Sequence, residues 1–166
     1  MTLSDKTIFC RFCGGLLVDR FIEGKDRLIC DQCKMITYIN PVPASAVVVL
    51  KDNKVLLVKR GAEPKKGMWC LPGGFMEVDE SPEDCAIREL KEETALDANT
   101  YELLGLYSQK DGRYMNVLLM GYFIDEYEGS PIAADDAIDI GWFSYDELPR
   151  LAFKGHRYFI DLVFKQ

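Results

Sequence analysis

From Gly74 to Leu96 the chain reads GFMEVDESPEDCAIRELKEETAL, and this segment carries the clearest structural signal in the sequence. Its middle, Ser81–Asp84, has the chemistry of a helix start, with serine at the N-cap, proline at the first helical position and an acid at the third. The residues that follow recur at helical spacing, namely Ala86, Ile87, Leu90 and Thr94. The sequence therefore predicts a helix that begins after Ser81 and buries this stripe.

Three glutamates share one face of the predicted helix. Glu92 is three residues and Glu93 four residues after Glu89, so the three carboxylates are neighbours on the helix surface. Like charges at these spacings destabilise an isolated helix by roughly 0.2–0.5 kcal/mol per pair. A hard cation such as Mg²⁺ relieves that repulsion and keeps waters for substrate phosphates. The three glutamates are therefore candidate metal ligands.

Two further features surround these carboxylates. Arg88 is the cation that adjoins them, and Glu80, just before the helix, is placed to pair with it. The glycines Gly73 and Gly74 allow a close approach of the backbone, with carbonyl oxygens available to the same metal. The pattern thus combines a carboxylate face, one arginine and a glycine loop.

Gly74, Glu80 and the run Arg88–Leu96 resemble the Nudix box, a pattern of 23 residues that this chain matches at every fixed position but one. The departure is Ala95, where the family has the glycine that closes the helix. If the backbone there is left-handed, alanine costs about 1 kcal/mol relative to glycine. The resemblance extends from about Pro43 to the C-terminus.

The resemblance implies an α/β/α sandwich that hydrolyses a nucleoside diphosphate linked to another group. By motif, it implies Mg²⁺ (or Mn²⁺) ligation by Glu89, Glu92 and Glu93 with the Gly73 or Gly74 carbonyl. Arg88 and Glu80 would pair and hold the helix against the loop. The metal would polarise a phosphoryl oxygen and activate an attacking water. The proton acceptor is left open between Glu92, Glu93 and an acid outside the box, Asp135 or Asp136.

The remainder of residues 41–166 is mixed α and β, of the α+β class. Strands are expected at 44–51, 55–60, 103–108, 114–123 and 138–143, and short helices at 144–148 and 155–164. Because the strands do not alternate regularly with helices, a doubly wound sheet is not favoured. The turn signal Asn40–Pro43 marks a boundary between this Nudix domain and residues 1–40.

Residues 1–40 contain two C-x2-C pairs sixteen residues apart, Cys10/Cys13 and Cys30/Cys33, which is the spacing of a four-thiolate zinc site. Short strands at 16–21 and 27–30 would flank a hairpin turn between the pairs. A unit this small cannot fold by burial alone, so the metal would supply its folding energy. All four positions are filled by cysteine, which predicts a structural zinc ribbon. Cys70 and Cys85 are expected to be small buried side chains.

Composition and charge exclude some classes of function for this protein. The chain has 166 residues and a formal net charge of −7, with residues 1–40 nearly neutral and the remainder acidic. An acidic surface disfavours nucleic-acid binding through phosphate contacts. Neither a membrane span nor a secretory signal is visible, so a cytoplasmic protein is expected.

The sequence indicates the substrate less clearly than it indicates the reaction. A zinc ribbon ahead of a Nudix domain resembles two known groups. One is the NADH pyrophosphatase group, whose activities include removal of the NAD cap from RNA, and the other consists of compact proteins similar to ADP-ribose and FAD pyrophosphatases. The first group has a Ser-Gln-Pro-Trp-Pro-Phe-Pro run, whereas this chain continues from Ser108-Gln109 into Lys110–Arg113, which favours the second. Candidate substrate contacts are Arg60, Arg113 and Asp136, with Trp69, Phe75, Tyr114, Phe153 and Tyr158 as candidate base platforms.

Three alternatives stay open. The ribbon could read RNA while the Nudix domain processes its 5′ end, or the ribbon could make a homodimer. The protein could also be a regulator that senses a nucleotide without turnover, although the complete glutamate set argues against this.

Overall fold

The computed structural model describes residues 8–110 and 116–165, and its contacts divide the chain into two compact units between Asn40 and Pro41. The N-terminal unit is a three-stranded antiparallel sheet of β1 (Leu17–Ile22), β2 (Lys25–Cys30) and β3 (Ile36–Thr37). Its small core consists of Cys10, Leu17, Leu28 and Cys30, with Ile8 packed against them. The two longer strands were predicted within two residues at each end, whereas the two-residue β3 gave no sequence signal.

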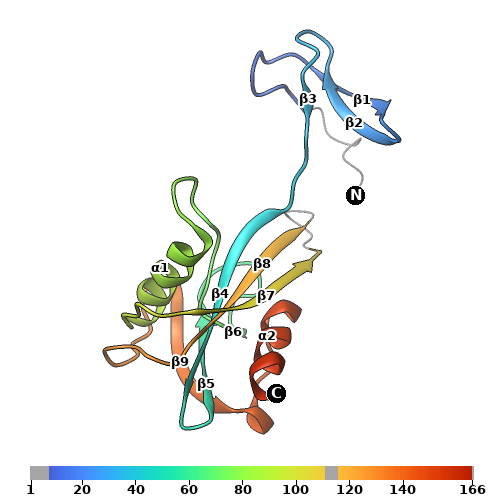
Figure 1. The fold of residues 1–166 in the computed structure, drawn as a ribbon. Helices are drawn as coiled ribbons and strands as arrows, with labels where there is room; N and C mark the ends of the chain where they lie inside the picture. Colours follow the sequence, from blue (N-terminus) through green and yellow to red (C-terminus); the bar gives the residue numbers. More distant parts are fainter. Residues whose placement is uncertain (1–7, 111–115, 166) are drawn as a thin grey trace. The chain divides into compact units, whose positions relative to one another are not determined.

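The C-terminal unit is built on a six-stranded mixed sheet (Figure 1). Strand β4 (Val42–Lys51) is central, with β5 (Lys54–Arg60) and β6 (Trp69–Cys70) on one side and β8 (Val117–Ile124) and β7 (Glu102–Gln109) on the other. Strand β9 (Ala137–Ser144) pairs with β5, and β4 and β8 form the parallel pair. Helices α1 (Pro82–Thr94) and α2 (Lys154–Phe164) and the 3₁₀ turn η2 (Tyr145–Glu147) complete the unit.

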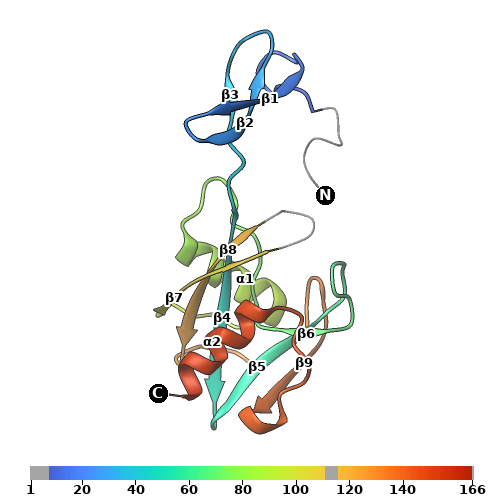
Figure 2. The same ribbon diagram turned by 90° about the vertical axis from the view of Figure 1, so that its right-hand side faces the viewer.

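The two helices cover opposite faces of the strands (Figures 1 and 2). Alternate residues of β4 point to the two helices in turn. Ala44, Ala46 and Val48 belong to the core that includes α2. Val47 and Val49 belong instead to the core that includes α1. A strand buried on both faces reads as a continuous apolar run, as β4 does. The expected α/β/α sandwich of the α+β class is thereby confirmed.

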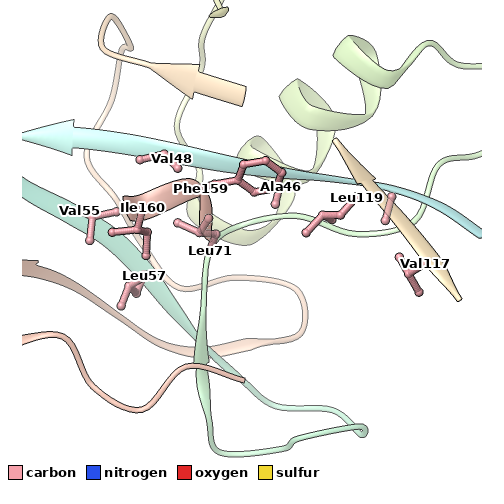
Figure 3. Close-up of a cluster of buried hydrophobic side chains, with 10 residues drawn as sticks. Ala46, Val48, Val55, Leu57, Leu71, Val117, Leu119, Phe159 and Ile160 are labelled. Atoms are coloured by element: carbon pink, nitrogen blue, oxygen red, sulfur yellow. The ribbon is translucent and has the colours of Figure 1, made fainter. Parts of the chain in front are cut away.

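The core on the α2 side is centred on Phe159 and Ile160 (Figure 3). Val117 and Leu119 project from β8 at one end of this cluster, and Leu71 reaches it from the chain after β6. A Cβ at Gly121 would lie 2.3 Å from the Phe159 ring, so glycine there allows the ring to pack on β8. The cluster therefore fixes α2 against the strands that lead to the glycine loop.

Helix α1 begins as predicted. Ser81 is the N-cap, its Oγ accepts from the Asp84 N–H at 3.1 Å, and the Asp84 carboxylate accepts from the Ser81 N–H in return. This capping box and Pro82 at the first helical position satisfy the helix start. At the other end Ala95 is left-handed, with φ 59° and ψ 16°, and its N–H donates to the Lys91 carbonyl.

Replacing Ala95 with glycine is expected to raise the free energy of unfolding by about 1 kcal/mol, because glycine adopts this left-handed backbone without a Cβ clash. Urea denaturation followed by tryptophan fluorescence measures the change. Ala86→Gly, inside the same helix, is the matched control and is expected to destabilise. A destabilised Ala95→Gly would show that the alanine methyl group contributes packing that outweighs the backbone strain.

The two units divide between Asn40 and Pro41, and part of the turn expected there lies in a strand. Pro43 was expected in the turn, but it lies within β4 opposite Leu118 of β8. The strand accommodates a proline there because Val42 donates to Asn116, while the Pro43 carbonyl accepts from Met76 on the other side. Among the described residues neither helix has the length and hydrophobicity needed to span a membrane.

Candidate functional site

The glycine loop after β6 lies against β4. Ser45 donates its N–H to the Gly74 carbonyl at 3.0 Å, and Val47 donates to the Pro72 carbonyl at 2.9 Å. Gly73 has φ 148°, and a Cβ there would lie 2.2 Å from the Ser45 carbonyl oxygen. Only glycine can therefore bring the loop this close to the strand.

Helix α1 directs Glu93 at this loop. The Glu93 carboxylate is buried and accepts the Gly73 N–H at 2.9 Å. Burial raises the pKa of Glu93 to about 9, the Gly73 N–H opposes the rise, and the charges of Asp136 and Glu89 add to it. Among the described residues no lysine or arginine forms an ion pair with Glu93. A buried acid beside other acids, with no cation, is the arrangement that a divalent cation stabilises.

Glu89 lies one turn earlier on the same helix, against Gly74. A Cβ at Gly74 would lie 2.4 Å from Oε1 of Glu89, so this glycine leaves the space that the carboxylate occupies. Burial raises the pKa of Glu89, Arg88 opposes the rise, and the charges of Glu92 and Asp136 add to it. The two glycines thus accommodate one glutamate each.

Arg88 binds the other carboxylates. Its Nη2 and Nε donate to the two oxygens of Glu80 at 2.7 and 2.9 Å, which is a bidentate pair. Nη1 donates to Glu89 at 2.7 Å and to the more exposed Glu92 at 2.9 Å. Nη2 also donates to the Phe75 carbonyl at 3.2 Å, so the arginine connects helix α1 to the glycine loop. The Arg88 hydrogen bonds lower the pKa of Glu80 to about 2.

Asp136 lies outside the box in sequence but close to Glu93 in space. The chain before β9 runs along the end of α1, where Ala134 donates to the Glu93 carbonyl and Ile132 to the Thr94 carbonyl. The half-buried Asp136 contributes to the raised pKa values of both Glu93 and Glu89. Asp135 instead occupies a left-handed turn position and is exposed. Of the two acids considered from sequence, the structure therefore brings Asp136 to the site.

A pocket adjoins the glycine loop on the α2 side. The glycine loop, strands β4, β5, β7 and β8, and the start of α2 contribute to its lining. The lining residues are Ala44, Ser45, Arg60, Pro64, Gly73, Gly74, Phe75, Gln109, Val117, Leu119, Phe153 and His156. The Arg60 guanidinium lies 5.4 Å from the Phe153 ring centroid, and its Nε donates to the Pro64 carbonyl at 2.9 Å.

The structure separates the aromatic candidates. Phe75 and Phe153 line the pocket. Trp69 instead packs edge-on against Phe143 with centroids 4.8 Å apart, and Tyr158 contacts Tyr107 and Phe159. Arg113 and Tyr114 lie outside the described residues.

His156 was missed by sequence reasoning, although it is the single histidine of the chain. It is 6% exposed, and its Nδ1 accepts the Leu71 N–H at 3.0 Å. Burial, followed by the charge of Arg60, lowers its pKa to about 3, so the imidazole is neutral at physiological pH. Its partner is 85 residues away in sequence, so no local pattern could have found this contact.

The four N-terminal cysteines form the second candidate site. Their Sγ atoms all lie within 4.8 Å of one another, with Cys13 and Cys30 at 3.4 Å and Cys10 and Cys33 at 3.7 Å. A tetrahedral zinc with bonds of about 2.3 Å requires sulfurs about 3.8 Å apart, so the cluster fits this ion. Cys70 and Cys85 lie outside the cluster and are 1% and 0% exposed, as expected of small core residues.

The backbone presents the thiols through two similar knuckles. Gly14 donates to the Cys10 carbonyl in the first, and Lys34 donates to the Cys30 carbonyl in the second. Both residues have positive φ, at 75° and 62°. Gly14 thus makes the tight turn of the first knuckle, and a lysine takes the equivalent position in the second knuckle.

The chain is similar in sequence and in fold to known Nudix proteins. A NUDIX domain model matches residues 40–163. An ADP-ribose pyrophosphatase of Methanocaldococcus jannaschii is 40% identical over 124 residues, which are 74% of this chain and 73% of that protein. The NAD-capped RNA hydrolase NudC of Vibrio atlanticus is 31% identical over 87% of this chain, and the chain spans about half of that protein (52%). The NUDIX domain of Shewanella oneidensis NrtR, solved with ADP ribose, has a TM-score of 0.66 at 27% identity and covers 77% of this chain and 89% of that one.

Proposed function

The chain belongs to the Nudix family of pyrophosphohydrolases, and from that premise we propose that it hydrolyses ADP-ribose to AMP and ribose 5-phosphate. One observation carries the proposal at the site, namely the buried Glu93 carboxylate, which has no cation partner in residues 8–110 and 116–165 and is held at the glycine loop beside Asp136. The choice of ADP-ribose follows the similarity to the Methanocaldococcus jannaschii enzyme, which covers about three quarters of both chains. FAD contains the same AMP half, joined through a diphosphate to its second group, and is the nearest alternative substrate.

The residues at the site fit a divalent metal, Mg²⁺ or Mn²⁺. Glu93 supplies a carboxylate that no lysine or arginine of the described segments pairs with, and Glu89 and Glu92 supply two more from the same helix. The Gly74 carbonyl already accepts the Ser45 N–H, which makes the Gly73 carbonyl the better backbone donor. When bound, such a metal would stabilise charge on the diphosphate and acidify a bound water.

The chain's own groups then have separate tasks. Arg88, through its bidentate pair with Glu80, holds helix α1 against the loop so that the glutamates keep their positions. Asp136 accepts the proton of the attacking water on its carboxylate. Water adds across the P–O–P bond, so one phosphate leaves on AMP and the other on ribose 5-phosphate. Arg60, which lines the pocket, binds a phosphate oxygen.

The four-cysteine cluster holds a structural zinc. All four donors are thiolates, so the tetrahedral site is closed and has no position for substrate. The zinc stabilises the N-terminal unit rather than taking part in hydrolysis.

A second candidate is hydrolysis of an NAD cap on RNA or of NADH. It is favoured by the NudC similarity, which extends beyond the Nudix domain into the cysteine-containing unit. It is disfavoured by the segment after Ser108-Gln109, which lacks the proline- and tryptophan-rich run of the NADH pyrophosphatase group.

Incubation of the protein with ADP-ribose, FAD, NADH, a dinucleoside polyphosphate and an NAD-capped RNA tests the proposal. We expect cleavage of ADP-ribose to AMP with Mg²⁺, loss of activity in EDTA, and its return when excess Mg²⁺ is added. Chromatography of the products identifies the bond that is cut. A higher kcat/KM for NADH or capped RNA than for ADP-ribose would show that the proposed substrate is wrong. Failure to cleave any of the five would contradict the proposed function.

A further inference from the structure

We propose that His156 determines base specificity at this site, with its Nε2–H donating a hydrogen bond to a ring nitrogen of the adenine base. The inference rests on the proposed function, because it places the AMP half of the substrate in the pocket beside the glycine loop. It assigns a residue that belongs to no part of the Nudix box. Three observations lead to it.

The first is the tautomer. Because Nδ1 accepts the Leu71 N–H at 3.0 Å, the proton of the neutral ring must be on Nε2. The low pKa of His156, caused by burial, keeps the ring in this neutral form. The imidazole is therefore a fixed donor at Nε2, aligned by the backbone of the chain segment after β6.

The second is the unpartnered donor. His156 is 94% buried, yet within residues 8–110 and 116–165 its polar contact is the one at Nδ1. Every fully buried polar side-chain atom in those residues has a hydrogen-bond partner. The unpartnered Nε2 is therefore an atom that reaches the surface of the pocket, which His156 lines. A donor left open in an apolar pocket costs free energy unless a ligand accepts from it.

The third is the composition of the pocket around it. The Phe153 ring lies 5.1 Å from the imidazole, and Val117 and Leu119 supply apolar surface from β8. A flat, apolar heterocycle with ring acceptors fits such walls better than a phosphate does. Charge is supplied separately by Arg60, also on the pocket lining.

The pocket also adjoins the glycine loop, where the diphosphate would be cleaved. Gly73 and Gly74 line it, and the Gly73 N–H is the group that Glu93 accepts from. A nucleotide with its base at His156 can therefore extend its phosphates toward the glycine loop. The neutral donor selects a ring acceptor, while the arginine and the loop serve the phosphates.

Because the chain has one histidine, nitrogen NMR of protein labelled with ¹⁵N-histidine reports on this residue without assignment. We expect AMP to move the Nε2 resonance downfield while Nδ1 stays unchanged. Ribose 5-phosphate, which lacks the base, is expected to move neither. One of the 1-deaza, 3-deaza and 7-deaza analogues of AMP should fail to cause the change, and that analogue identifies the acceptor.

Kinetics give an independent measurement. In His156→Asn the amide oxygen can still accept the Leu71 N–H, so kcat/KM for ADP-ribose is expected to fall about fivefold to tenfold, through KM, with kcat within twofold. Arg157→Gln, at the next position of α2 and exposed, is the matched control and should leave KM unchanged.

Each result bears on the inference separately from the proposed function. An unchanged Nε2 resonance at saturating AMP, an equal change with ribose 5-phosphate, or no loss with any deaza analogue would overturn the role of His156. An unchanged KM in His156→Asn would do the same. Failure of the wild type to cleave ADP-ribose would instead contradict the proposed function, while the AMP titration would still test the base contact.

Discussion

Glu93→Gln is expected to lower kcat for ADP-ribose on the order of a thousandfold, because metal stabilisation of the reacting phosphates supplies several kcal/mol and each 1.4 kcal/mol corresponds to tenfold. The same substitution is expected to raise thermal stability. In the wild type the buried carboxylate accepts one N–H from Gly73 and forms no ion pair among the described residues. The amide oxygen of glutamine can accept the same N–H without the free-energy cost of burying a charge or of protonating the acid, which the raised pKa of Glu93 reflects.

Steady-state kinetics and thermal denaturation, measured on the same preparation, test both parts. Glu102→Gln, an exposed position on β7, is the control for a general effect of removing a negative charge. A slow but more stable variant is the signature of a carboxylate that is unfavourable for the fold and required for the chemistry. Near-normal turnover in a folded Glu93→Gln would show that Glu93 is not a metal ligand.

Cys13→Ser is expected to reduce the zinc content well below one ion per chain and to unfold the N-terminal unit, since structural zinc supplies about 10–16 kcal/mol of binding free energy in comparable small sites. Cys13 is exposed, so the substitution removes a ligand with little change in packing. The small core of this unit contains two of the other ligands, Cys10 and Cys30, and is too small to hold the sheet together without the zinc.

Metal analysis and limited proteolysis measure the loss, and turnover per folded Nudix domain is expected to stay within twofold. Cys85→Ser, a buried cysteine outside the cluster, is the control and should retain zinc. A parallel fall in zinc content and turnover would mean that the N-terminal unit contributes to substrate binding. Full zinc occupancy in Cys13→Ser would contradict the four-thiolate site.

The elements most accessible from sequence were those set by local chemistry. The start of α1 follows from Ser81, Pro82 and Asp84, whose interactions span three residues. The cysteine spacing likewise predicts a cluster, because each C-x2-C turn fixes two thiols locally. The β-branched run at 44–51 also predicts a strand, which is β4 in the structure.

The parts that sequence left open or did not reveal depend on long-range packing. Asp136 reaches Glu93 because the segment before β9 bonds to the end of α1, and nothing near Asp136 in sequence encodes that contact. His156 meets Leu71 because Phe159 and Ile160 fix α2 against the sheet. Strands of two residues, such as β3 and β6, carry too few side chains for any periodicity.

The hydrogen bonding of Arg88 has a consequence for sequence variation at position 88. Its guanidinium donates to Glu80, Glu89, Glu92 and the Phe75 carbonyl in one planar fork. Lysine would keep the positive charge, but its ammonium group has three donors, arranged as a point charge, and cannot form the bidentate pair. With three donors for the five contacts that Arg88 makes, lysine would leave at least two of these contacts unmade. Across descendants of this sequence, exchange of arginine for lysine here is expected to be selected against as strongly as loss of the charge itself.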